Sequence, residues 1–153
     1  MTRRSILLFV AAFAAIAIPT ANAFAKSVPI YTGTFNNLAV GGYDSVAYFT
    51  LGKPLKGDTQ FALKHAGAEW RFVSAENRDK FAAAPEHYAP QYGGYCAWAV
   101  SQGYTASGNP QNWTIVDGKL YLNYDTEVQK RWEKDIPGFI AKANHNWPNV
   151  LDK

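Results

Sequence analysis

Cysteine is almost missing from this chain: Cys96 is the only one among 153 residues. No disulfide can form within the chain, so a small disulfide-stabilised scaffold is excluded. The sequence also lacks a run of like charges, and its formal net charge is only +3. A basic surface that follows a phosphate backbone is therefore not expected, which argues against nucleic acid as a partner.

Long hydrophobic runs are also scarce, and the one that is present lies at the start of the chain. It extends from Ile6 to Ile18, too short to span a bilayer, and Arg3 and Arg4 precede it. This arrangement is typical of a secretory signal peptide, which we predict over residues 1–25. The arginine pair suits either the general secretory (Sec) route or the twin-arginine route.

Small residues after the hydrophobic run predict cleavage behind Ala23 or Ala25. The mature protein, residues 26–153, is then expected to be periplasmic or secreted and to have no membrane span. Its roughly 128 residues are enough for one domain with its own core. We detect no internal repeat, low-complexity tract or linker in the sequence, so we predict a single domain over this range.

A strand followed directly by a helix is predicted in the middle of the chain. Trp70 and Phe72 alternate with charged residues, as in a strand with one buried face. Ser74 is suited to cap a helix, Ala75 to Ala84 favours one, and Pro85 is expected to stop it.

The strand with Trp70 is predicted to form a hairpin with the residues before it, through a turn at Ala66-Gly67. This register places Lys64 opposite Glu69, where the two charges can pair across the strands. The apolar side chains of the hairpin then share one face: Phe61, Leu63, Trp70 and Phe72.

A second hairpin is predicted around Asp117-Gly118, because this pair suits a turn with two positive φ angles. A two-residue turn there places Ile115 opposite Leu120 and Trp113 opposite Leu122, with all four side chains on one face. Turn chemistry and hydrophobic pattern therefore agree.

The remaining elements are a short strand, expected at Val46 to Phe49, and helix from Asp125 onward. Apolar residues recur there at steps of three or four, at Val128, Trp132, Ile136, Phe139, Ile140, Ala143 and Trp147. Pro137 interrupts the pattern, which predicts two helices that meet near Asp135-Ile136, or one kinked helix. The expected fold is α+β, with a small antiparallel sheet of hairpins packed against a short helix and a kinked or broken C-terminal helix.

The order and spacing of residues 43 to 90 resemble the YHS domain family. The resemblance is carried by Asp44-Ser45-Val46, Trp70-Arg71-Phe72, Ser74, and Phe81 through Pro85-Glu86-His87-Tyr88. That small domain occurs beside copper-transporting ATPases and mercury-handling proteins, so the resemblance implies a metal-binding role. The rest of the chain, with its closing hairpin and helix, resembles a longer exported bacterial subgroup of the family and forms a C-terminal extension.

This sequence departs from the family at the cysteines of its D-P-V-C and F-C-S-x-x-C segments. The corresponding residues are Ala47, Val73 and Asn77. None of them supplies a thiolate, the soft ligand that holds copper(I), zinc or mercury. The metal role that the resemblance implies therefore does not transfer to these three positions.

The candidate ligand site is the turn around Cys96, where Gly93-Gly94 lets the backbone approach a ligand. Its residues are Cys96, Tyr92, Tyr95 and Trp98, together with His87 nine positions before the cysteine. Cys96 and His87 would be the metal ligands, and imidazole with thiolate suits copper or zinc. The alternatives for Cys96 are a buried structural residue and a reactive thiol, and the alternative for His87 is a surface histidine.

No local signature of a catalytic triad, a phosphate-binding glycine loop or an H-E-x-x-H metal site is present. We therefore expect a non-catalytic, exported YHS-type binding module for a metal ion or small ligand in the bacterial envelope. One alternative is a thiol-dependent redox protein or enzyme that uses Cys96. Another is a structural subunit that binds an envelope protein and no ligand of its own.

Overall fold

The computed structural model describes residues 27–153, so the predicted signal peptide and its cleavage sites lie outside the described residues. In chain order the elements are η1 (Val40–Gly42), α1 (Ala47–Thr50), β1 (Asp58–His65), β2 (Ala68–Phe72), α2 (Ala75–Ala83), α3 (Pro85–Tyr88), η2 (Gln91–Gly94), α4 (Ala97–Ser101), β3 (Asn109–Val116), β4 (Lys119–Asn123), α5 (Thr126–Trp132), η3 (Glu133–Asp135), α6 (Ile136–Asn146) and η4 (Asn149–Asp152), where η marks a 3-10 helix. None of the described helices is long and apolar enough to cross a membrane.

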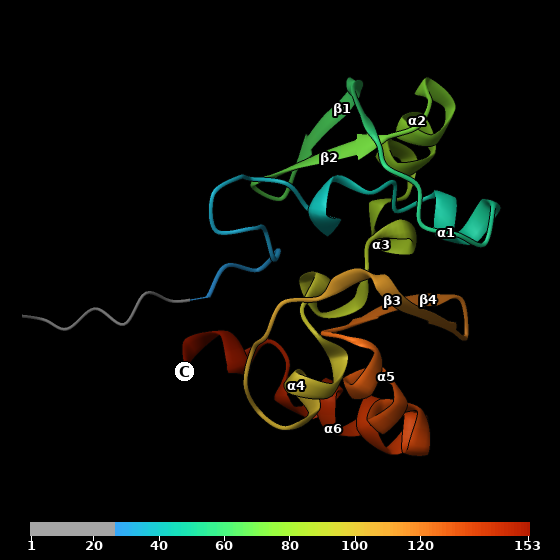
Figure 1. Ribbon diagram of the computed structural model, residues 1–153. Helices are drawn as coiled ribbons and strands as arrows, with labels where there is room; N and C mark the ends of the chain where they lie inside the picture. Colours follow the sequence, from blue (N-terminus) through green and yellow to red (C-terminus); the bar gives the residue numbers. More distant parts are fainter. Residues whose placement is uncertain (1–26) are drawn as a thin grey trace, which may run out of the picture.

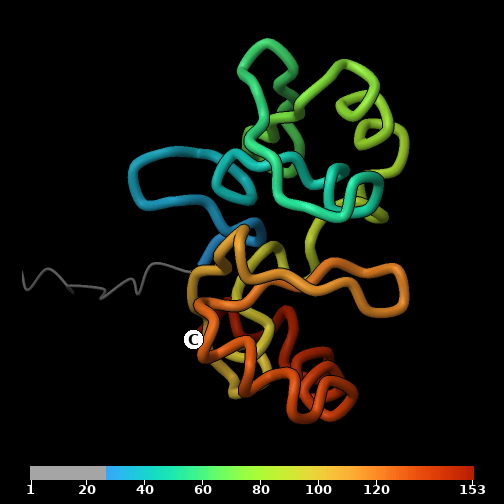
Figure 2. Tube along the Cα trace, turned by 45° about the vertical axis from the view of Figure 1, so that its right-hand side comes forward, coloured from blue at the N-terminus to red at the C-terminus, as the bar shows by residue number. Residues whose placement is uncertain are grey.

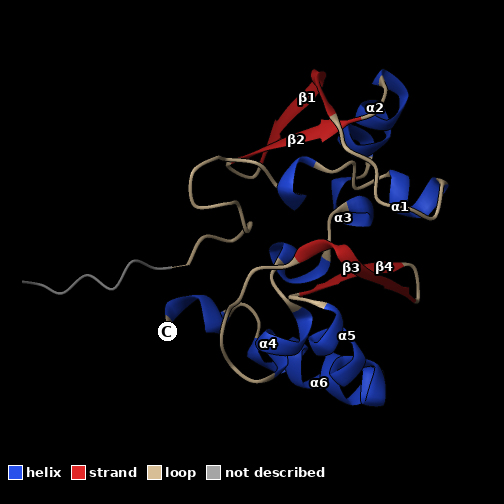
Figure 3. Cartoon of the chain, viewed as in Figure 1, coloured by secondary structure: helices blue, strands red, loops and turns tan. Residues whose placement is uncertain are grey.

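The α+β prediction is confirmed, with two separate antiparallel hairpins, β1–β2 and β3–β4, in place of one sheet. Figure 1 shows the two hairpins in two lobes, one above the other, each with its own helices. Figure 3 shows that the upper lobe holds β1, β2, α1, α2 and α3, and the lower lobe holds β3, β4, α4, α5 and α6.

Both hairpins have the predicted register. In the first, Lys64 lies opposite Glu69 across the Ala66-Gly67 turn. The carboxylate of Glu69, however, accepts a hydrogen bond from Nε of Arg71 at 2.7 Å on its own strand, so the expected Lys64–Glu69 charge pair is replaced by a neighbouring one.

In the second hairpin Ile115 pairs with Leu120 and Trp113 with Leu122, as the Asp117-Gly118 turn requires. The two turn residues have φ angles of 49° and 70°, which is the geometry that Asp-Gly was expected to adopt.

The central helix begins and ends as the sequence predicts. The Ser74 hydroxyl accepts a hydrogen bond from the backbone N–H of Asn77 at 3.2 Å, which caps α2. Pro85 ends α2 and also opens the short helix α3, because a proline lacks the N–H that a first helical turn leaves unused.

The predicted strand at Val46 to Phe49 is wrong, because this segment forms helix α1. The backbone N–H groups of Val46 and Ala47 both donate to Oδ1 of Asp44, at 2.8 and 3.2 Å. An aspartate that accepts these free donors favours a helical turn, and this local bonding overrides the β propensity of the side chains.

The C-terminal helical region is broken where it was expected to be. Asp135 has a φ of −154° and a ψ of 66°, and its carboxylate accepts a hydrogen bond from the N–H of Gly138. Residue 135 therefore ends the first helical segment and caps α6, in which Pro137 occupies the first turn.

The expectation of no internal repeat is wrong, because the two hairpins have the same pairing pattern. Asp58 pairs with Phe72 in the first and Asn109 pairs with Asn123 in the second. Every pair of the second hairpin lies 51 positions after a pair of the first, and both ladders shift register at the same place. Two hairpins with the same bulge and the same turn length indicate a duplicated unit.

The segments on both sides of the hairpins repeat as well. Val40-Gly41-Gly42 and Tyr92-Gly93-Gly94 are each three successive residues with positive φ, and a short helix follows each of them. The next positions are also equivalent: the N–H of Asp44 donates to the carbonyl of Leu55 at 2.8 Å, and the N–H of Cys96 to that of Ala106 at 2.9 Å. Asp44 and Cys96 are therefore counterparts in the two halves.

The two halves pack through strand β4, whose faces are both buried. Leu120 and Leu122 belong to the first core cluster, with Trp70, Phe72 and Phe81. Tyr121, between them, belongs to the second cluster, where Trp132 is completely buried. The alternation of side chains along one strand thus joins the two cores.

The N-terminal segment crosses between the lobes, as the blue part of the tube in Figure 2 shows. The N–H of Ser27 donates to the carbonyl of Leu151 and that of Tyr31 to the carbonyl of Gly93. Gly93 is required there, because a Cβ at this position would collide with the carbonyl of Pro29. The first described residues of the chain are therefore part of the fold.

Candidate functional site

The first half of the chain is organised around the carboxylate of Asp44, which is completely buried. Besides the two N–H groups of α1, it accepts hydrogen bonds from the N–H of Val73 at 2.9 Å and from Nδ2 of Asn77 at 2.7 Å. Ala47, Val73 and Asn77, the three residues that correspond to cysteines in the resemblance to the YHS family, all donate to this one carboxylate. The fold therefore gathers these positions, and in this chain an aspartate holds them together.

The corresponding positions in the second half line a pocket. Counted from Cys96, the counterpart of Ala47 is Ala99, and 51 positions after Val73 and Asn77 lie Tyr124 and Val128. A pocket of about 220 Å³ is lined by Cys96, Trp98, Ala99, Tyr104, Ala106, Tyr124 and Val128. We call it the Cys96 pocket.

The pocket is present because the second half cannot make the hydrogen bonds that fill the equivalent space in the first. Valine at position 128 has no polar group to offer, and the Cys96 thiol is a weak hydrogen-bonding group compared with a carboxylate. In the second half Oδ1 of Asn123 is the acceptor at the start of the short helix, as Asp44 is in the first. It accepts from the N–H of Trp98 at 3.2 Å and from Sγ of Cys96 at 3.6 Å.

Cys96 is a neutral thiol in this setting. Its side chain is 1% exposed, and burial raises the pKa of the thiol above its ordinary value. Sγ donates to Asn123, and the described residues include no second cysteine that could form a disulfide. The pocket therefore holds a soft, uncharged group on its wall.

The described structure places His87 in different surroundings from Cys96. The His87 ring packs against Phe49 and Tyr88, with ring centroids 5.3 and 4.6 Å apart, and it does not line the Cys96 pocket. Within residues 27–153 no group of three or more His, Cys, Asp or Glu side chains converges as metal ligands. The site thus brings Cys96 and Trp98 together, without His87.

Tyr92 and Tyr95, the other two predicted site residues, are buried and hold the fold together. The hydroxyl of Tyr92 donates to Oδ1 of Asn144 at 2.8 Å, and that of Tyr95 donates to the carbonyl of Val28 at 2.8 Å. Burial raises the pKa of both phenols. Their hydroxyl groups are therefore used to fasten the C-terminal helix and the N-terminal segment.

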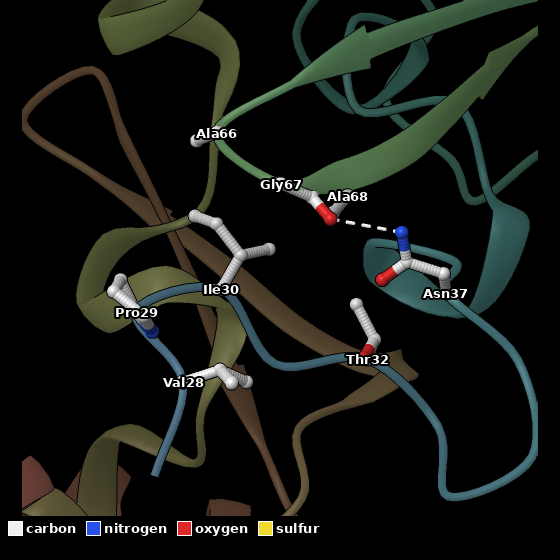
Figure 4. A pocket seen from close by; sticks show the side chains of 8 residues that line it. All are labelled: Val28, Pro29, Ile30, Thr32, Asn37, Ala66, Gly67 and Ala68. Carbon is white, nitrogen blue, oxygen red and sulfur yellow. Dashed lines mark hydrogen bonds between the residues drawn. The ribbon is translucent and has the colours of Figure 1, made fainter. Parts of the chain in front are cut away.

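A smaller pocket of about 180 Å³ lies between the N-terminal segment and the β1–β2 turn, and none of the predicted site residues lines it. Figure 4 shows Ile30 and Thr32 on one side of it and Ala66 and Gly67 on the other. Nδ2 of Asn37 donates across it to the carbonyl of Gly67 at 2.8 Å. These contacts fix the N-terminal segment to the hairpin.

Sequence reasoning missed five residues that line the pocket with Cys96 and Trp98: Ala99, Tyr104, Ala106, Tyr124 and Val128. A signal for one of them was present: Gly-Gly-Tyr-Asp at residues 41–44 returns as Gly-Gly-Tyr-Cys at 93–96, 52 positions later. Aligning the two halves on this motif places Ala99 at the position of Ala47, whereas Tyr124 and Val128 follow only from the hairpin offset of 51 positions.

Comparison of the chain with protein-family models, with curated proteins and with solved structures found no match.

Proposed function

We propose that this protein is a non-catalytic, exported binding module of the YHS type that holds a small uncharged ligand in the Cys96 pocket. The observation that carries the proposal is the correspondence between the two halves. The positions that surround Asp44 in the first half surround an open pocket in the second. In such a duplicated protein the first half, whose site is filled, can stabilise the fold. The second half, whose site is open, can bind a ligand.

The size and lining of the pocket support a ligand with one or two rings. Its volume of about 220 Å³ exceeds the roughly 150 Å³ of an apolar protein cavity that binds benzene. Aromatic side chains with few polar groups are the usual lining of small-molecule sites. Among residues 27–153, no Asp, Glu, Lys, Arg or His lines the pocket, which favours an uncharged ligand.

The thiol-dependent alternative is less well supported, because it needs a thiolate. A catalytic or redox cysteine is activated by a nearby cation or a helix N-terminus that lowers its pKa. Burial is the largest influence on the pKa of Cys96 and raises it, and the carboxylate of Asp125 raises it further. Backbone hydrogen bonds at the start of the short helix α4, of which Cys96 is the N-cap residue, lower the pKa by less than burial raises it. A copper or zinc site at Cys96 and His87 would require His87 to leave its packing against Phe49.

Indole titration by calorimetry tests the proposal, with Ala106→Leu as the blocking variant. Leu55 occupies the equivalent position in the first half, so leucine is compatible with this backbone. Ala82→Leu, on the exposed face of α2, is the matched control. We expect parent and control to bind indole and the Ala106→Leu protein to bind at least about tenfold more weakly, a loss of about 1.4 kcal/mol.

Equal indole affinity in the blocked protein would show that the pocket is not the site. Binding of zinc or copper(I) that is lost in both Cys96→Ser and His87→Ala would favour the metal function in its place.

A further inference from the structure

The Cys96 pocket has an open neighbour on the other side of Tyr124. Tyr124 lines both the Cys96 pocket and a second hollow of about 470 Å³, and the chain passes from Ala106 in the first to Ser107 in the second. Tyr124 is 52% exposed, and Tyr104, at the Cys96 pocket, is 48% exposed. Two exposed large hydrophobic side chains of the described residues thus line two adjoining hollows, which we together call the groove.

The two parts of the groove differ in chemistry but share a lack of charge. The Cys96 pocket is apolar and aromatic, whereas the second hollow is lined by uncharged polar side chains, Asn36, Ser107 and Asn109, beside the ring of Tyr31. In the part of the chain that the structure describes, no acidic, basic or histidine side chain lines either hollow. The groove therefore fits a neutral ligand with one apolar end and one hydrogen-bonding end.

The polar end of the groove has amide groups with a fixed orientation. Oδ1 of Asn36 accepts a hydrogen bond from the N–H of Leu38 at 3.1 Å, and Oδ1 of Asn109 accepts from the N–H of Gln111 at 2.9 Å. Since the backbone holds the oxygen of each amide, Nδ2 is left as the donor for a ligand. Donors held in place in this way bind hydroxyl oxygens with little loss of side-chain entropy.

We propose that the ligand is an uncharged, elongated molecule with the chemistry of an aryl glycoside. Its ring lies in the Cys96 pocket, and its hydroxyl-bearing part crosses Tyr124 and meets Asn36 and Asn109 in the second hollow. Aromatic faces combined with neutral amide donors suit a sugar ring, which presents an apolar face and a rim of hydroxyl groups. This inference rests on the proposed function, because it assumes that the Cys96 pocket is a binding site.

The test compares phenyl β-glucoside with its two halves, phenol and methyl β-glucoside, by calorimetry on the parent and on Asn109→Asp. The aspartate keeps the hydrogen bond to Gln111, because Asp58 accepts the equivalent bond from the N–H of Gln60 at 2.8 Å in the first half. It also replaces the Nδ2 donor by an acceptor. Asp58→Asn, the reverse change outside the groove, is the matched control.

We expect the parent and the control to bind phenyl β-glucoside at least tenfold more tightly than phenol, about 1.4 kcal/mol. Asn109→Asp should lose this advantage and keep its phenol affinity. If phenol binds and the glucoside binds no more tightly, the inference about the ligand is wrong and the proposed function stands. If no ring compound binds, both fall.

Discussion

Replacing Asp44 by asparagine tests whether one buried carboxylate holds the first half together. The substitution keeps the size of the side chain and one carbonyl oxygen, which can still accept from Val46 and Ala47. It turns the second oxygen into an amide donor that faces two other donors, the N–H of Val73 and Nδ2 of Asn77. Both of these groups then lose their acceptor.

The expected cost follows from the two buried donors. An unsatisfied buried polar group costs about 1–3 kcal/mol, so Asp44→Asn should lower the free energy of unfolding by about 2–6 kcal/mol. Urea denaturation measures this value, and Asp79→Asn is the control, because Asp79 is mostly exposed and pairs only with Arg78 at the surface. The control should change the stability by less than about 1 kcal/mol.

A second substitution shows whether the loss comes from this contact. In the double variant Asp44→Asn with Asn77→Asp, the new amide donates to the new carboxylate, while the Val73 N–H stays unsatisfied. The double variant should therefore be more stable than the sum of the two single effects predicts, by about 1–3 kcal/mol. An Asp44→Asn protein within 1 kcal/mol of the parent would refute the reasoning.

Four further predictions concern the core, the thiol and the N-terminus. Trp132→Ala should cost about 3–5 kcal/mol of unfolding free energy, because Trp132 is completely buried, whereas Phe35→Ala, at a 99% exposed side chain, should cost almost nothing. Native Cys96 should react with maleimide far more slowly than in urea, as followed by mass spectrometry. Burial raises the pKa of the Cys96 thiol in the folded protein, so above about pH 8.5 the thiol of the unfolded chain loses its proton first. The free energy of unfolding should therefore fall as the pH rises, by at most about 1.4 kcal/mol per pH unit, and it should fall less steeply in Cys96→Ala. N-terminal sequencing of exported protein should begin after Ala23 or Ala25, and recovery of Met1 in that fraction would contradict the predicted signal peptide.

The elements that the sequence predicted correctly are those in which local chemistry and hydrophobic pattern agree. The Asp117-Gly118 turn, the Ser74 cap and the break near Asp135 each depend on residues within four positions of one another. The strand expected at Val46 to Phe49 failed because its backbone bonds to Asp44 outweigh the preference of its side chains. A propensity scale rates each residue by itself and takes no account of a neighbouring carboxylate, such as that of Asp44, that caps a helical turn.

The candidate site was predicted only in part, because some of the residues that line it are far from Cys96 in sequence. Cys96 and Trp98 are neighbours in sequence and share the pocket, but the pocket is closed by Tyr124 and Val128, which come from the segment after β4. His87 was included because it is near Cys96 in sequence, yet its ring packs in the first half. Proximity in sequence does not distinguish Trp98, which lines the pocket, from His87, which does not.

The duplication also explains how a pocket can remain open in so small a protein. Side chains that line a pocket lack packing contacts on one side, so they contribute less to stability than fully packed side chains. Here the equivalent space of the first half is filled by Asp44 and Asn77, while β4 gives Leu120 and Leu122 to the first core and Tyr121 to the second. The well-packed half therefore stabilises the strand that supports the open half. Filling the Cys96 pocket, as Ala106→Leu does, should consequently raise the stability of the protein while it removes the site for a ligand.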